Sequence, residues 1–180
     1  MRQHHLHGFT LIELMITLVV LGILIALGLP SYSGWITNTQ VRVLAESLQN
    51  GLRLAQREAA MRNGSVVFSL TKITTPACAS TAATDGTNWT VCAGGAAVQT
   101  GVSAAGGEMT TVASDFSSVT FNGLGRTNLA NSSKIDVGSS KGVCDSGSGG
   151  VRCLRILLST AGKVRMCDPQ LPAGDPAACS

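Results

Sequence analysis

The sequence has no histidine beyond residue 7, and this absence removes most of the familiar catalytic chemistry. All three histidines, His4, His5 and His7, lie near the N-terminus. The rest of the chain therefore cannot form a Ser–His–Asp triad, a Cys–His pair or an H-E-x-x-H zinc site. A G-x-x-x-x-G-K-[ST] phosphate-binding loop is also missing, because Gly162-Lys163 is followed by valine. We therefore expect neither an enzyme nor a cofactor.

Charged residues are scarce and nearly balanced, so composition alone does not identify a partner. They make up 13% of the chain, and 13 lysines and arginines face 10 aspartates and glutamates. A nucleic-acid-binding function would have to depend on where the cations lie rather than on net charge. A metal site is not expected either, because no two cysteines have the C-x-x-C spacing and no histidine beyond residue 7 can assist them.

Cysteine is well represented, and its even number indicates disulfides. Disulfides form outside the cytosol, so the cysteine-bearing part of the chain is expected to be exported. The sequence leaves the pairing open. Our working assignment pairs sequence neighbours, and each such bridge would close a short loop and add about 3 kcal/mol. The pairs are Cys78–Cys92, Cys144–Cys153 and Cys167–Cys179.

A long apolar run dominates the N-terminal part. It extends from Phe9 to Leu29, and Glu13 is its only charged residue. As a helix with a rise of about 1.5 Å per residue, the run would be about 32 Å long, close to the roughly 30 Å of a bilayer's hydrocarbon core. A secretory signal peptide would place a small-residue cleavage site after the run, but Pro30 follows it. We therefore expect the run to be retained as a transmembrane helix.

Residues 8–13, Gly-Phe-Thr-Leu-Ile-Glu, resemble the processing motif of type IV prepilins and type II secretion pseudopilins. The resemblance implies that a prepilin peptidase cleaves between Gly8 and Phe9 and that the new amine of Phe9 is methylated. It also implies that Glu13 pairs with the amine of a neighbouring subunit during filament assembly. Physical chemistry agrees, because a carboxylate in apolar surroundings is costly unless a cation meets it. The alternative is a simple membrane anchor with Glu13 in the headgroup zone.

A helical pattern continues beyond Pro30, which we expect to kink or interrupt the helix. Asn63-Gly64 is a helix stop signal suited to a left-handed cap. Between these points, apolar residues recur at three- and four-residue steps and define one face. The residues of this face are Val41, Leu44, Ala45, Leu48, Leu52, Ala55 and Ala59.

The part after residue 63 is predicted to form strands. Short β-branched or apolar runs, bounded by turn-forming residues, occur at 65–70, 89–92, 109–113, 119–122, 134–137, 151–158 and 163–167. Most connections are too short for a crossover helix, so the sheet should be mainly antiparallel. The predicted fold class is α+β, with a long N-terminal helix packed on an antiparallel β-sheet ectodomain.

The predicted division of the chain has four parts. Residues 1–8 are the leader, and 9–30 are the transmembrane and assembly helix. Residues 31–63 form the amphipathic half of the N-terminal helix. Residues 64–180 form the β-rich ectodomain, whose proline-rich tail should be irregular and tied back through Cys179.

Two C-terminal segments resemble FimT/GspH-type minor pilins and pseudopilins. They are 121–126, Phe-Asn-Gly-Leu-Gly-Arg, and 159–167, Ser-Thr-Ala-Gly-Lys-Val-Arg-Met-Cys. The cysteine-bearing end fits minor pilins of the FimT or FimU kind better than secretion pseudopilins. Together with the N-terminal motif, the resemblance implies the pilin-like fold described above.

Some FimT-like pilins bind DNA through a C-terminal G-R-x-R motif, and the resemblance makes Lys163 and Arg165 the corresponding candidates here. Strand alternation would place both on one face, and Arg126, Arg152 and Arg155 could extend the patch. Lysine at position 163 keeps the charge of the motif's first arginine but loses the guanidinium fork that suits phosphate. The alternative is an edge strand whose cations simply discourage sheet-to-sheet pairing.

These features predict a minor pilin of a type IV pilus. It would enter the inner membrane as a single-pass protein with a periplasmic ectodomain, be cut by the prepilin peptidase, and join other pilins in a filament. Two alternatives are a DNA-binding minor pilin that serves DNA uptake in natural transformation, and a pseudopilin of a type II secretion system. The expected partners are the peptidase, other major and minor pilins, the inner membrane and, in the first alternative, DNA.

Overall fold

The computed structural model describes residues 9–103, 109–145 and 150–179, without the side chains of 27–33. The expected leader, 1–8, and with it the cleavage-site residue Gly8, lie outside the described residues. The chain divides into two compact units, Met1–Trp35 and Ile36–Ser180. This boundary falls a few residues after the one predicted at residue 30.

One helix, α1 (Leu11–Arg62), links the two units. Thr10 precedes its first turn, and the Thr10 hydroxyl oxygen accepts a hydrogen bond from the Glu13 backbone N–H at 3.3 Å, which is the role of a helix N-cap. The interruption predicted at Pro30 is wrong, because the helix is continuous through that residue. A proline removes one backbone donor but does not prevent the turns on either side from forming.

The C-terminal end of α1 has the cap that its sequence predicts. Asn63 adopts a φ of 46°, in the left-handed region. The Gly64 N–H donates to the Ala59 carbonyl at 3.1 Å, and the Asn63 N–H donates to the Ala60 carbonyl at 3.3 Å. These two bonds form a Schellman motif, which satisfies carbonyls that the helix itself leaves unpaired.

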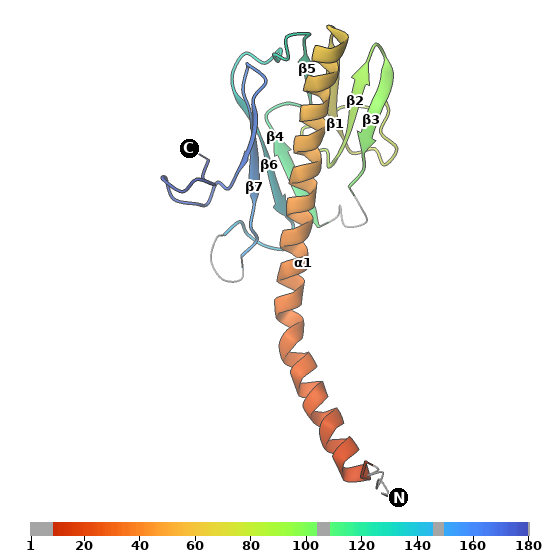
Figure 1. The fold of residues 1–180 in the computed structure, drawn as a ribbon, viewed down its shortest axis with the longest axis vertical. Coiled ribbons are helices and arrows are strands. Elements are labelled where there is room, and N and C mark those ends of the chain that lie inside the picture. The colour runs from red at the N-terminus through yellow and green to blue at the C-terminus, as the bar shows by residue number, and fades with distance from the viewer. Residues whose placement is uncertain (1–8, 104–108, 146–149, 180) are drawn as a thin grey trace, which may run out of the picture. The chain divides into compact units, whose positions relative to one another are not determined.

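The second unit contains two antiparallel four-stranded sheets (Figure 1). Sheet A has the order β3-β2-β1-β5, and sheet B has the order β4-β6-β7-β8. The strands are β1 (Val66–Thr71), β2 (Asn88–Ala93), β3 (Ala96–Gly101), β4 (Thr110–Ser114), β5 (Ser118–Phe121), β6 (Ser133–Ser139), β7 (Leu154–Leu158) and β8 (Val164–Cys167).

The predicted α+β class is confirmed, but the division into two sheets and strand β3 were not predicted. Strand β3 is rich in alanine, which has little intrinsic preference for strands. The turn before it was the available signal. Gly94 and Gly95 both have positive φ, at 58° and 82°, as a two-residue hairpin turn of the primed type requires.

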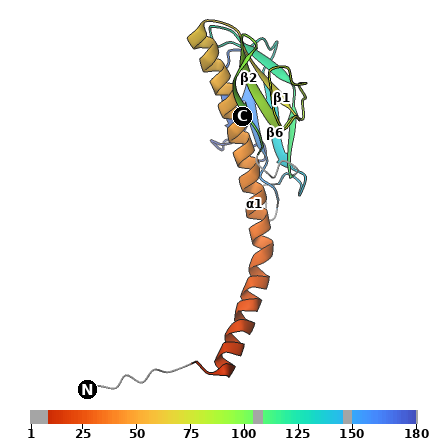
Figure 2. The ribbon, with the colours of Figure 1, turned by 90° about the vertical axis from the view of Figure 1, so that its right-hand side faces the viewer.

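The core of the second unit lies between α1 and the inner faces of both sheets (Figure 2). All seven residues of the predicted apolar face of α1 are buried, so that prediction is confirmed. The helix approaches sheet A closely at Gly51: a Cβ there would come within 2.9 Å of the Phe68 ring and 3.0 Å of the Trp89 ring. Glycine therefore permits the two aromatic rings, whose centroids are 5.8 Å apart, to pack against the helix.

Three disulfides staple the unit, and they join sequence neighbours. The bonds are Cys78–Cys92, Cys144–Cys153 and Cys167–Cys179. The last one ties the C-terminal tail to the end of β8. The Asp168 N–H also donates to the Ala177 carbonyl at 2.8 Å, so both ends of the tail are held together.

Replacing Cys167 and Cys179 together by serine should destabilise the second unit by about 3 kcal/mol, because the bridge closes a short loop in the unfolded chain. Cys167 is buried at the end of β8, and Cys179 is partly buried in the tail. The measurement is urea denaturation of the oxidised wild type and the double variant. An unchanged midpoint would show that this disulfide contributes nothing to the fold.

Candidate assembly segment and basic surface

The first unit exposes an apolar helix surface. Phe9 is 82% exposed and Leu11 is 77% exposed. Every described large apolar residue from Phe9 to Ile25 is at least 50% exposed. A contiguous apolar surface of this kind marks a site of association. In the described part of the chain, no helix is long and apolar enough to cross a membrane.

Glu13 is the only charged side chain on this surface, and it lies in the first turn of α1. Its position satisfies two requirements. The positive end of the helix dipole favours a carboxylate there, and Thr-x-x-Glu is the sequence of a helix-capping box. The helix dipole and the capping box would both favour Glu13 in a polar helix as well, so they do not explain why the residues around it are apolar. Once this surface is covered by another chain, the carboxylate needs a cation as its partner.

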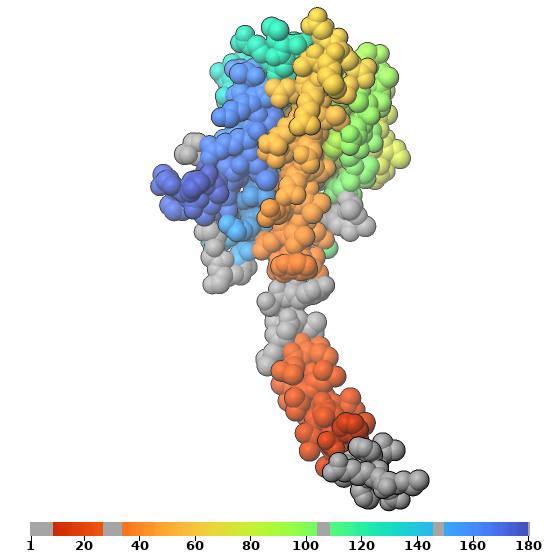
Figure 3. Space-filling view, in the orientation of Figure 1, coloured from red at the N-terminus to blue at the C-terminus, as the bar shows by residue number. Residues whose placement is uncertain are grey.

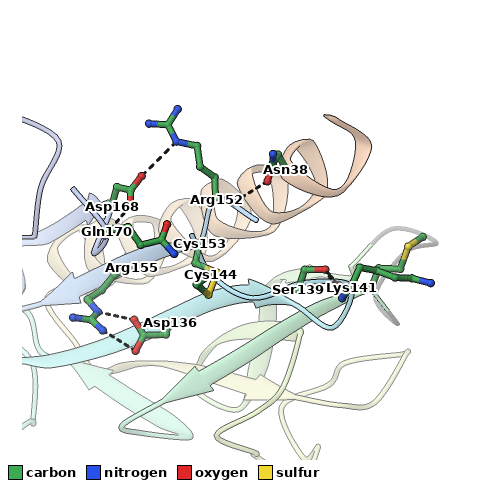
Figure 4. Close-up of a disulfide and its surroundings, with 11 residues drawn as sticks. Asn38, Asp136, Ser139, Lys141, Cys144, Arg152, Cys153, Arg155, Asp168 and Gln170 are labelled. Carbon is green, nitrogen blue, oxygen red and sulfur yellow. Dashed lines mark hydrogen bonds and ion pairs between the residues drawn. A yellow bond between two sulfur atoms is a disulfide. The ribbon is translucent and has the colours of Figure 1, made fainter. Parts of the chain in front are cut away.

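The predicted basic surface is largely occupied by bonds within the chain (Figure 4). The Arg155 guanidinium donates to both carboxylate oxygens of Asp136 on the neighbouring strand β6, from Nε at 2.5 Å and from Nη2 at 3.1 Å. The hydrogen bond to Asp136 raises the pKa of Arg155 further above its ordinary value. Arg155 is thus a structural residue that joins β6 to β7.

Arg152 and Arg165 are also engaged with the chain. Arg152 Nε lies 3.4 Å from a carboxylate oxygen of Asp168, which is 4% exposed. The Arg152 backbone N–H donates to the Asn38 side-chain oxygen of α1 at 2.8 Å. The Arg165 guanidinium donates from Nη2 to the Ala178 carbonyl at 2.7 Å and so helps to hold the C-terminal tail.

Arg126 and Lys163 differ from these three residues, because both are exposed and no ion pair of either is found among the described residues. They come from loops that contact each other. The Thr127 N–H of the β5–β6 connection donates to the Thr160 carbonyl of the β7–β8 turn at 3.1 Å. Arg126 and Lys163 are far apart in the sequence, and the contact between the two loops brings their parts of the chain together.

A close backbone approach fixes these two loops against α1. Gly162 has a φ of 86°, and a Cβ on it would overlap the Gly125 carbonyl oxygen. That same oxygen accepts a hydrogen bond from the Gln56 side chain of α1 at 3.1 Å. The glycines of the two segments that resemble minor pilins therefore meet at one point on the helix.

Two further groups of cations lie outside the predicted DNA-binding set. Lys134 Nζ lies 3.8 Å from Asp136, two residues along the same strand β6, and the register of β6 against β7 adds Arg155 to this pair. Arg53 and Arg57 line a groove between α1 and sheet A. Their spacing of four residues on one helix was a visible signal, but it does not show what lies opposite.

Two family models match the chain. Residues 44–162 match the family described as type II transport protein GspH, and residues 5–29 match the prokaryotic N-terminal methylation motif. The first match spans most of the second unit, including Arg126, and ends at Gly162, one residue before Lys163.

Curated relatives resemble the N-terminal part of the chain. A fimbrial protein of Pseudomonas aeruginosa is 41% identical over 64 residues, which are 36% of this chain and 41% of that protein. A type IV major fimbrial protein FimA of Dichelobacter nodosus is 49% identical over 47 residues, which are 26% of this chain and 29% of that protein. The chain thus spans less than half the length of these relatives.

A solved structure shares the fold. It is the crystal structure of the type IV minor pilin FimU of Pseudomonas aeruginosa, with a TM-score of 0.52 and 17% sequence identity over 79% of this chain and 96% of that chain. At this identity the likeness shows the fold alone, which is that of a pilin. Because the family model covers most of the chain and the N-terminal motif accompanies it, the chain belongs to the GspH family of pilin-like proteins.

Proposed function

We propose that the chain is a minor pilin of a type IV pilus, processed after Gly8 and assembled through its N-terminal helix. In this proposal the mature protein begins with a methylated Phe9. The apolar sequence of residues 9–29 supports residence in the inner membrane before assembly. The role is structural, since the chain supplies a subunit to a filament and catalyses no reaction.

One observation carries the proposal. An exposed apolar helix with a single carboxylate is attached to a separate compact unit that has its own core and three disulfides. The second unit buries a core of its own, whereas the described large apolar side chains of the first are exposed. In such a chain the apolar helix is suited to association with other chains, and the second unit is suited to remain folded on its own.

Replacing Gly8 by valine should leave the precursor uncut, because a branched side chain at the position before the cleaved bond would keep it out of a peptidase site that accepts glycine. The measurement is the intact mass of the chain purified from membranes. The control is His7→Val, which places the same side chain one residue further from the cleaved bond and should be processed normally. A variant at Gly8 with the mature mass would contradict the proposed cleavage site.

A type II secretion pseudopilin is the alternative within the same family, and the description of the family model names that transport system. The fimbrial relatives favour the pilus. Deleting the gene separates the two: loss of surface filaments supports the pilus, and loss of secreted proteins with intact filaments supports the pseudopilin.

DNA binding during uptake is a second candidate function, and the contact between two loops favours a specific site for it. Arg126 and Lys163 are exposed cations on loops that touch, so they could meet neighbouring phosphates. The other three predicted residues, Arg152, Arg155 and Arg165, already bind acceptors in the chain. DNA binding by this surface therefore depends on two of the five predicted cations, Arg126 and Lys163.

If the chain binds DNA in this way, replacing Arg126 and Lys163 together by alanine should weaken binding and reduce the slope of log affinity against log salt by about 1.8, or about 0.9 for each lost phosphate contact. The measurement is a fluorescence titration with duplex DNA at several salt concentrations. Arg42→Ala is the control, because Arg42 is exposed but pairs with Glu46 on α1. Wild-type protein that is inert at low salt would reject DNA binding by this surface.

A further inference from the structure

The chain itself covers most edges of its two sheets. At β5, the Asn128 N–H donates to the Thr120 carbonyl at 3.0 Å, and the Thr120 N–H donates to the Asn128 side chain at 3.0 Å. At β8, the Gln49 amide oxygen, turned toward the strand, accepts from the Met166 N–H at 3.3 Å. At the end of β4, the Ser114 N–H donates to the Thr84 carbonyl at 2.9 Å.

Strand β3 is different, because its outer edge has no backbone hydrogen bond to any of the described residues. It is six residues long, and most of its side chains are exposed. It contains no proline and no charged residue, although proteins commonly use these residues to protect open edges. An unprotected edge of this kind is a template on which another strand can pair.

A groove runs beside this edge, between α1 and sheet A. It has a volume of about 560 Å³. Leu54 and the largely buried Trp89 line it on the apolar side, Gln99 of β3 lines it on the sheet side, and Arg53 and Arg57 line it on the helix side. In the space-filling view, the helix and the green strands of sheet A lie next to each other along this face (Figure 3).

The helix side of the groove carries an excess of positive charge. Arg53 and Arg57 are exposed, and neither forms an ion pair with a carboxylate among the residues that the structure describes. The acidic residue of the groove, Glu46, is bonded to Arg42 at 2.8 Å. In the orientation that bonds Met166, the Gln49 amide oxygen also accepts from Arg53 Nη2 at 3.2 Å, which leaves the other donors of that guanidinium for a ligand. Two guanidinium groups one helical turn apart, neither paired with a carboxylate among the described residues, are suited to a carboxylate.

We propose that β3 and this groove bind an extended segment of a neighbouring pilin subunit. The segment pairs with β3 as a fifth strand of sheet A and places an acidic side chain between Arg53 and Arg57. The backbone pairing supplies affinity, and the carboxylate supplies register and specificity. A pilin subunit is the occupant because the inference rests on the proposed function, in which other pilins surround the chain in a filament.

Photo-crosslinking in assembled filaments tests this contact. A photoreactive p-benzoylphenylalanine is placed at Gln99 of the full chain, and sheared filaments are irradiated and analysed by mass spectrometry. The expected product joins Gln99 to an extended, acid-containing peptide of another pilin. The matched control site is Ala113, which is exposed on β4 of the other sheet and should not crosslink to such a peptide.

A second photoreactive site, Leu18 on the exposed apolar helix, separates this proposal from the proposed function. Leu18 should crosslink to another subunit wherever the chain is assembled. Crosslinking from Leu18 without crosslinking from Gln99 would overturn the β3 contact and leave assembly intact. Absence of both crosslinks would overturn the proposed function together with the contact.

Charge reversal tests the carboxylate. Replacing Arg53 and Arg57 by glutamate should reduce the Gln99 crosslink roughly tenfold or more, because like charges placed together at an interface cost several kcal/mol. The control is the Arg126→Glu/Lys163→Glu variant, which changes the net charge equally and should leave the crosslink unchanged. An equal yield from both variants would overturn the pairing of Arg53 and Arg57 with an acidic side chain.

Discussion

Replacing Glu13 by glutamine is expected to remove the chain from sheared filaments while its N-terminus is still processed. Glutamine keeps the size of the side chain and its ability to serve in a helix-capping box, but it loses the charge. If Glu13 pairs with the amine of a neighbouring subunit, the loss leaves that amine without a partner in an apolar environment. Breaking such a pair costs about 3–5 kcal/mol, so incorporation should fall by about a hundredfold or more.

The control for this experiment is Thr17→Ala, one turn further along the same exposed helix. The Thr17 hydroxyl donates to the Leu14 carbonyl at 2.9 Å, so this polar group is satisfied within its own helix. Its removal should leave incorporation unchanged. The measurement is the ratio of chain in the filament fraction to chain in the membrane fraction by immunoblot. Wild-type recovery of the Glu13→Gln chain would show that the charge has no part in assembly.

Replacing Phe68 by alanine should destabilise the second unit by about 3–5 kcal/mol. Phe68 lies on the central strand β1 of sheet A, is fully buried, and packs against Trp89 and the glycine of α1 at position 51. Removing the ring leaves a cavity that the helix and two neighbouring strands cannot easily fill. A loss of this size is a large part of the roughly 5–15 kcal/mol by which a domain is usually stable.

Leu124→Ala is the matched control, because it also removes a large apolar side chain. Leu124 is 82% exposed on the β5–β6 connection and should change stability by less than about 0.5 kcal/mol. The measurement is urea denaturation of both variants beside the wild type. Equal effects of the two substitutions would contradict the position of Phe68 in the core.

The sequence predicted those features of the fold that depend on residues close together in the chain. The apolar face of α1 from Val41 to Ala59 follows from helical spacing, and the cap at Asn63 follows from one Asn-Gly pair. The N-terminal motif and the family were likewise recognisable from short segments. These features depend on local geometry, which a linear pattern records directly.

The basic surface could be predicted only in part, because its chemistry depends on contacts between distant residues. Arg155 was a candidate ligand for DNA, but the register of β7 against β6 places it opposite Asp136. Arg165 was another, but the folded-back tail offers it the Ala178 carbonyl. The open edge of β3 and its groove were missed for the same reason, since an open edge is defined by what the rest of the chain does not cover.

The most direct test of the account is the intact mass and N-terminal fragmentation of the wild-type chain recovered from sheared filaments. The account predicts a chain that begins at Phe9 and carries one added methyl group on its terminal amine, with three disulfides intact. A chain that begins at Met1, or that is found in membranes but never in filaments, would contradict assembly as a processed pilin subunit.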